Sequence, residues 1–215
     1  MKCDISLSPG LLARGGEPRH DGAPYFYIDA TPGGWGARGD GEDGLMSAVN
    51  GSIKLQPAEV FEAKYPIRVT EYALRPDSEG PGRLRGGFGV RRAFQLEADA
   101  SMYLWMERSV TPAWGLFGGG AAEGPRMRIA GSQDRRDLKA NRLPLRAGDT
   151  VTMDTGGGGG WGDPFERDPE AVLRDVRAGL MSRERARERY GVAIAGDPAA
   201  VDAAATRELR RGRPA

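Results

Sequence analysis

The stretch Gly156-Gly157-Gly158-Gly159-Gly160-Trp161-Gly162-Asp163-Pro164 contains five consecutive glycines. Two backbones can touch only where no side chain separates them, whereas a glycine-rich loop that leads directly into a helix can instead bind phosphate. Here no Lys-Ser or Lys-Thr pair follows the glycines, and several residues separate them from the next helix start. The run is therefore predicted to be a structural glycine loop at which backbone segments cross.

The residues before the glycine run indicate a β-rich body with many turns. The 215 residues include 33 glycines and 15 prolines, which argues against an all-helical protein, while 39% hydrophobic residues can form a core. A short helix is predicted at 57–65, between two prolines. Strands are predicted from apolar alternation or from aromatic and β-branched content at 25–30, 67–74, 91–96, 100–107, 127–129 and 150–155.

The residues after the glycine run indicate helices. Asp168 and Ser182 are good N-caps for two short helices, the second of which ends at Gly191. No apolar stripe follows in 194–215, which predicts a mobile tail, helical at most at 199–209. The expected fold is α+β, a β-rich body with glycine turns and a short C-terminal helical appendage. The expected divisions are an N-terminal lead-in at 1–28, the β-rich region at 29–165, the two-helix appendage at 166–193 and the tail at 194–215.

Charge and composition exclude several classes of function. The 31 Lys and Arg against 30 Asp and Glu give a net charge of +1, so no overall field attracts nucleic acid or an anionic membrane. One cysteine, Cys3, and one histidine, His20, are too few to build a zinc-type site in this chain alone. No apolar stretch approaches the roughly 20 residues that cross a bilayer. We expect a cytoplasmic protein that binds no metal by itself.

Carboxylates are the abundant side chains with catalytic chemistry. They occur in pairs near the glycine loops and on the predicted helix: Asp40 with Asp43, Glu59 with Glu62, and Asp154 with Asp163. Paired carboxylates can bind a hard cation or share a proton, and a solvated surface is the alternative for each pair. For Asp163, which precedes a proline, a local Asx turn is favoured. Glu59 and Glu62 would share one helix face, and we retain both as candidate substrate-binding residues.

Several motifs occur in an order that is specific to one family. They are Gly33-Gly34-Trp35-Gly36-Ala37-Arg38, Pro57-Ala58-Glu59-Val60-Phe61-Glu62-Ala63-Lys64-Tyr65-Pro66, Arg85-Gly86-Gly87-Phe88-Gly89-Val90, Gly148-Asp149, Gly156 to Pro164, and Arg167-Asp168-Pro169-Glu170-Ala171-Val172. In this order, from about Asp29 to about Val192, the chain resembles the hydantoinase B / 5-oxoprolinase family. The resemblance covers only the C-terminal portion of such a protein, because family members are usually more than twice as long.

This resemblance implies part of an enzyme complex. It implies a hydantoinase-A-type partner that binds ATP and phosphorylates an amide or ketone oxygen, after which the B-type subunit hydrolyses a cyclic amide such as a hydantoin, 5-oxoproline or another lactam. The family's metal-holding His and Asp residues lie in an N-terminal region without a counterpart here. ATP, Mg²⁺ and a divalent metal are therefore expected on partner chains, namely the A-type subunit and an N-terminal B-type chain.

Two further expectations concern the residues that contact substrate and the class of function. In the loosely matching segment before the predicted helix, Asn50 and Ser52 are candidate contacts for a small cyclic-amide or ketone substrate, and catalytic residues stay unassigned. The chain is expected to be inactive alone. Two alternatives stay open: a subunit of a related ATP-dependent ketone carboxylase, and a non-catalytic assembly subunit.

Overall fold

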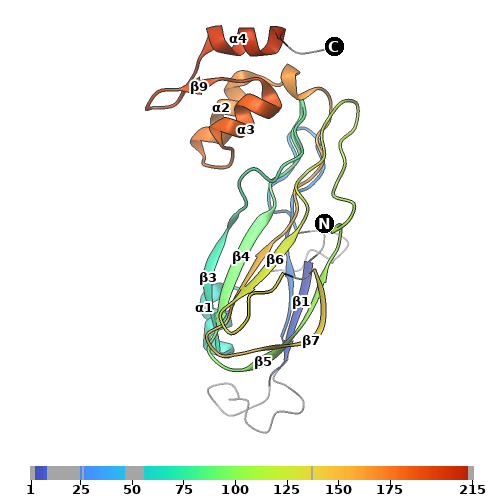
Figure 1. Cartoon of the computed structure of the whole chain (residues 1–215), viewed down its shortest axis with the longest axis vertical. Helices are drawn as coiled ribbons and strands as arrows, with labels where there is room; N and C mark the ends of the chain where they lie inside the picture. The colour runs from blue at the N-terminus through green and yellow to red at the C-terminus, as the bar shows by residue number, and fades with distance from the viewer. Residues whose placement is uncertain (1–2, 9–24, 26, 47–55, 137, 213–215) are drawn as a thin grey trace.

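The molecule is elongated and divides into a β-rich end and a helical end. In this computed structural model the described residues are 3–8, 25, 27–46, 56–136 and 138–212. Figure 1 shows the sheets at one end, the helices labelled α2, α3 and α4 at the other, and extended glycine-rich segments between them. The fold is α+β, as the sequence predicts.

Two four-stranded antiparallel sheets form the β-rich end. The first has the order β2-β1-β5-β7, with strands β1 (Cys3–Ser8), β2 (Tyr27–Thr31), β5 (Ala100–Met106) and β7 (Lys139–Leu145). The second has the order β3-β4-β8-β6, with strands β3 (Ile67–Leu74), β4 (Val90–Leu96), β8 (Thr150–Asp154) and β6 (Arg126–Ala130). The predicted strands at 67–74, 91–96, 100–107 and 150–155 are confirmed to within one residue.

A single apolar core joins the two sheets. Along β5 the inward residues Met102 and Leu104 are completely buried, and Val151 and Met153 are equally buried along β8. This period of two places one face of each strand against the opposite sheet. The predicted helix is α1 (Ala58–Lys64), whose Phe61 packs into the same core. The body is thus a β-sandwich with a helix on it.

Helices α2 (Pro169–Arg177) and α3 (Arg183–Tyr190) follow the short 3-10 helix η2 (Pro164–Glu166). Asp168 and Ser182 cap α2 and α3 through hydrogen bonds to backbone N–H groups, and Gly191 ends α3 at a φ of 60°. The structure thus confirms both predicted caps and the predicted glycine stop. The helices form a second small core around Tyr190 and the loop residue Phe88.

Two segments contain elements that the sequence did not predict. For 194–215 the sequence predicts a mobile tail, helical at most at 199–209; the described residues contain the hairpin β9 (Ile194–Ala195) and β10 (Ala200–Val201), and the helix α4 (Ala203–Arg211) overlaps the predicted helical segment. Polar contacts attach α4, which explains the missing apolar stripe: Thr206 Oγ1 accepts a hydrogen bond from Ala193 N, and Arg210 Nη2 donates to Arg167 O at 2.7 Å. The expected lead-in at 1–28 contains β1, which lies between β2 and β5.

Candidate functional site

The backbone of Gly156–Gly160 crosses other backbone segments so closely that no side chain fits. A Cβ on Gly158 would lie 1.8 Å from the carbonyl oxygen of Trp35, and one on Gly159 would lie 1.9 Å from that of Trp114. Real Cβ atoms essentially never come this close to other atoms. The run therefore requires glycine for space rather than for an unusual backbone angle.

Backbone hydrogen bonds hold this arrangement, which we call the glycine crossing: residues 156–160 with the segments 34–37, 78–87 and 113–123. Gly80 N donates to Gly158 O at 2.8 Å, while Gly158 N donates to Gly87 O at 2.9 Å. Because the N–H groups of Gly157, Gly158 and Gly160 all donate to protein carbonyls, they are not available to a phosphate.

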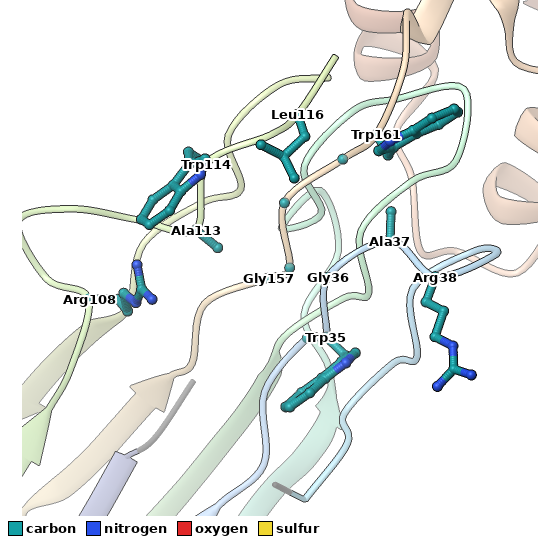
Figure 2. Close-up of a pocket in the computed structure, with 14 residues that line it drawn as sticks. Trp35, Gly36, Ala37, Arg38, Arg108, Ala113, Trp114, Leu116, Gly157 and Trp161 are labelled. Carbon is teal, nitrogen blue, oxygen red and sulfur yellow. The ribbon is translucent and has the colours of Figure 1, made fainter. Parts of the chain in front are cut away.

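A pocket of about 530 Å³ opens beside the glycine crossing. Figure 2 shows Trp114 and Arg108 on one side of the glycine run and Trp35 and Arg38 on the other. The indoles are open to solvent, with Trp35 40% and Trp114 62% exposed. We call this cavity the tryptophan pocket; it is lined by Gly34, Trp35, Gly36, Ala37, Arg38, Arg108, Ala113, Trp114, Leu116, Gly157, Gly158, Gly159, Gly160 and Trp161.

The lining of the tryptophan pocket combines aromatic faces with positive charge. The guanidinium of Arg108 lies 5.0 Å from the ring centroid of Trp114, within cation–π range. No carboxylate, histidine or cysteine occurs among the lining residues that the structure describes. The pocket can therefore bind flat, apolar or anionic groups, but those residues include no general base. Sequence reasoning missed it, although each tryptophan adjoins glycine, in Gly34-Trp35-Gly36, Trp114-Gly115 and Gly160-Trp161-Gly162.

Buried ion pairs connect the glycine crossing to the helices. Asp175 Oδ2 of α2 accepts hydrogen bonds at 3.1 Å from both Arg85 and Arg167. Arg85 also binds Asp43, and Arg167 binds Asp40. Burial opposes ionisation of Asp40, but the hydrogen bond and charge of Arg167 outweigh it and lower the pKa of Asp40 below its ordinary value. The predicted pair Asp40 and Asp43 is thus divided between two arginines.

Glu79 is a second charged group that sequence reasoning missed. Its side chain is fully buried, and Oε1 accepts hydrogen bonds from Arg185 Nε at 2.8 Å and Tyr190 Oη at 3.0 Å. Burial raises the pKa of Glu79 despite these partners. Both partners belong to α3, so Glu79 attaches this helix to the 78–87 segment.

The predicted substrate-binding residues do not line the tryptophan pocket. Glu59 is exposed on α1, whereas Glu62 Oε1 accepts a hydrogen bond from Val69 N at 2.7 Å and so fastens α1 to β3. Asn50 and Ser52 lie outside the described residues, as does His20. Asp163 Oδ1 accepts from Phe165 N at 2.9 Å, the local turn that the sequence favours for it.

Two features are absent from the described residues. Among them, no three His, Cys, Asp or Glu side chains come together in a way that could hold a metal ion. No helix in that part of the chain is long and apolar enough to cross a membrane.

The chain belongs to the hydantoinase B/oxoprolinase family, whose model matches residues 7–164 and so includes the whole tryptophan pocket. The putative B-type subunit of a D-/L-hydantoinase from Pseudomonas sp. (strain NS671) is 34% identical over 199 residues, which cover 87% of this chain and 32% of that protein. The crystal structure of the ATP-dependent caprolactamase from Pseudomonas jessenii matches 98% of this chain and 37% of its own, with 26% identity and a TM-score of 0.79. A nucleotide-free acetone carboxylase shares the fold, with a TM-score of 0.79 at 22% identity over 97% of this chain and 32% of its own.

These relatives are much longer than the chain. It spans about a third of the curated hydantoinase protein that it matches. The helices α2, α3 and α4 lie beyond the family match but within the likeness to the caprolactamase, which covers 98% of the chain.

Proposed function

We propose that this chain is part of a B-type subunit of an ATP-dependent hydrolase that opens cyclic amides. The observation that carries the proposal is the family match over residues 7–164, together with the likeness to an ATP-dependent caprolactamase over 98% of the chain. An A-type subunit would transfer the terminal phosphoryl group of ATP to the amide oxygen. Water would then add to the activated carbon, and the C–N bond would break, so that the ring opens with the amine protonated and an acyl phosphate formed. A second water would hydrolyse the acyl phosphate to a carboxylate and free phosphate.

In this proposal the chain shapes a site and does not supply its reactive groups. The described residues offer no ligand cluster for a divalent metal, so we assign the metal, ATP and Mg²⁺ to partner chains. The tryptophan pocket offers aromatic surfaces and two guanidiniums, which suit binding and positioning. For these reasons we expect no turnover by the chain alone.

Co-expression tests the proposal. The chain is produced with the A-type subunit and the remaining B-type polypeptide of the same genome, and ATP hydrolysis is measured with hydantoin, 5-oxoproline and caprolactam. We expect ATP-dependent ring opening only when all parts are present. Absence of ring opening in the assembled complex contradicts the proposal, and so does undiminished turnover when this chain is left out.

The likeness to acetone carboxylase favours one second candidate, a ketone-carboxylase subunit. The same complex then receives acetone or acetophenone with and without bicarbonate. Product formation that requires bicarbonate identifies a carboxylase, whereas ring opening without bicarbonate identifies the hydrolase.

A further inference from the structure

We propose that the tryptophan pocket and Phe117 beside it form the docking surface for the rest of a B-type subunit, the two thirds of its relatives that this chain does not cover. The occupant is a folded polypeptide that places apolar side chains and backbone carbonyls into the pocket. This inference rests on the proposed function, because it takes the chain to be one part of such a subunit.

The first argument is the length of the relatives that this chain does not cover. The chain covers 32% of the hydantoinase protein and 37% of the caprolactamase chain, so most of each relative is additional polypeptide. The pocket lies inside the residues that match the family. A surface of this region that is open here is therefore available to the additional polypeptide in a complete subunit.

The second argument is the contiguous exposed apolar surface. Trp35, Trp114 and Leu116 line one pocket and are 40%, 62% and 53% exposed. Phe117 is 79% exposed, and its ring packs edge-on at 5.8 Å against Trp161, another lining residue. Single exposed apolar residues are ordinary, but a contiguous group marks an interface, and tryptophan and arginine dominate interface energetics.

The third argument is the backbone around this surface. Phe117 and Arg108 adopt left-handed φ angles of 52° and 63°, which are rare for bulky residues and persist where the surrounding structure enforces them. Within the described part of the chain, the N–H groups of Gly36 and Gly159 donate to no protein acceptor. A Cβ on Gly36 would meet nothing within 4 Å, so the space beside it is open.

A small anionic ligand explains this surface less well. Arg38 and Arg108 are both exposed, so neither forms an enclosed anion site. Phe117 is not a lining residue, and a ligand within the pocket would leave its ring exposed. A polypeptide covers the pocket and Phe117 together.

A binding experiment tests the proposal. The full chain is titrated with the polypeptide of the same genome that matches the uncovered part of the family, without ATP or substrate. We expect Trp114→Ala and Leu116→Asp to raise Kd about 30-fold, as the loss of an interface anchor does. Gly36→Leu should also weaken binding, because its side chain fills the open space. Val60→Asp is the matched control: Val60 is 41% exposed on α1, and its Kd should change less than about twofold.

Several outcomes overturn the proposal. The first is no binding by the wild-type chain, and the second is an unchanged Kd in all three pocket variants. The third is self-association of the chain that Leu116→Asp abolishes, because a second copy would then be the occupant. Hydrogen exchange gives an independent readout, since binding should protect the amides of Gly36 and Gly159. Because only association is measured, normal binding in a complex without turnover would contradict the proposed function and leave the docking surface standing.

Discussion

The β-sandwich and the glycine crossing are held together by different contacts. In the sandwich, side chains such as Met102, Leu104 and Val151 fill the space between two sheets. In the crossing, backbone touches backbone, and Gly80 N–H···O=C Gly158 represents its typical contact. A sandwich core tolerates apolar exchanges of similar volume, whereas a backbone carbonyl cannot rotate away from an added methyl group. We therefore expect small changes in stability when an apolar residue of the sandwich is replaced by one of similar volume, and large losses when a methyl group is added to a glycine of the crossing.

The largest expected effect is Gly158→Ala. Its Cβ would lie 1.8 Å from Trp35 O, so the crossing must separate, and we expect a loss of more than about 3 kcal/mol in the free energy of unfolding. Gly36→Ala is the matched control, because its Cβ meets nothing within 4 Å, and should change stability by less than about 1 kcal/mol. Urea unfolding measures both, and equal effects would contradict the crowded geometry.

Next in size is Arg85→Met, which removes the arginine that Asp43 and Asp175 share and leaves Asp175 paired with Arg167 alone. Removing one member of a buried ion pair costs about 3 kcal/mol, and amide exchange in α2 should accelerate because the helices loosen. Arg91→Met is the comparison: Arg91 is 38% exposed in its pair with Asp154 and should cost less than about 1 kcal/mol. A larger loss at Arg91 would show that the ion pairs of the sandwich matter more.

A smaller effect is expected in the sandwich at Asp149, which is fully buried. Burial opposes its ionisation, but hydrogen bonds from Arg146 N, Ser132 N and Ser132 Oγ outweigh it and lower the pKa of Asp149. Asp149→Asn should cost about 2 kcal/mol at pH 7. Because the folded-state pKa is lowered, this contribution is complete above the ordinary value of about 3.9 and is lost as pH falls through the folded-state pKa.

Unfolding curves between pH 7 and pH 2.5 measure this prediction. The difference between wild type and Asp149→Asn should shrink toward the acid end. Asp134→Asn is the control, since the Asp134 side chain is 67% exposed, and its difference from wild type should stay small throughout. A difference at Asp149 that does not change with pH would contradict the assignment.

The smallest expected effect on stability is a difference between the two glutamates of α1. Glu62→Ala removes the acceptor of Val69 N–H and should cost about 1 kcal/mol, while Glu59→Ala should cost less than about 0.5 kcal/mol. Thermal unfolding measures both. Turnover of the assembled complex tests the separate prediction that these residues contact substrate, which a selective rise in KM for either variant would support.

Prediction from sequence succeeded where the signal is local. The bounds of β3, the alternation of β8 and the caps Asp168 and Ser182 follow from neighbouring residues, and the structure has them as expected. The alternation predicted for β3 is wrong beyond Val69, where the register shifts and the next four residues are all exposed. It failed where distant partners decide. β7 contains Pro144, which is tolerated because this strand lies at a sheet edge. The position of α4 depends on the contacts of Thr206 and Arg210, which no periodicity reveals.

The candidate site was likewise predictable only where the signal is local. The motif order identified the family, and the glycine run was expected at a backbone crossing. The pocket beside the run is assembled from segments around Trp35, Trp114 and Trp161, far apart in the chain, so only the folded backbone brings the indoles together. The buried Glu79 gave no signal either, because its partners Arg185 and Tyr190 lie more than a hundred positions away.

The glycine crossing also constrains the order in which its contacts can form while the chain is being synthesised. Each segment that contacts Gly156–Gly160 comes earlier in the chain, and neighbouring Thr155 Oγ1 donates to Pro32 O across 123 positions. The ribosome therefore releases the central segment only after all its neighbours, and closing loops of this length is entropically slow. Contacts among the earlier segments, such as that from Gly87 N to Trp35 O, involve residues that are already synthesised, whereas every contact of the run itself must wait for the run.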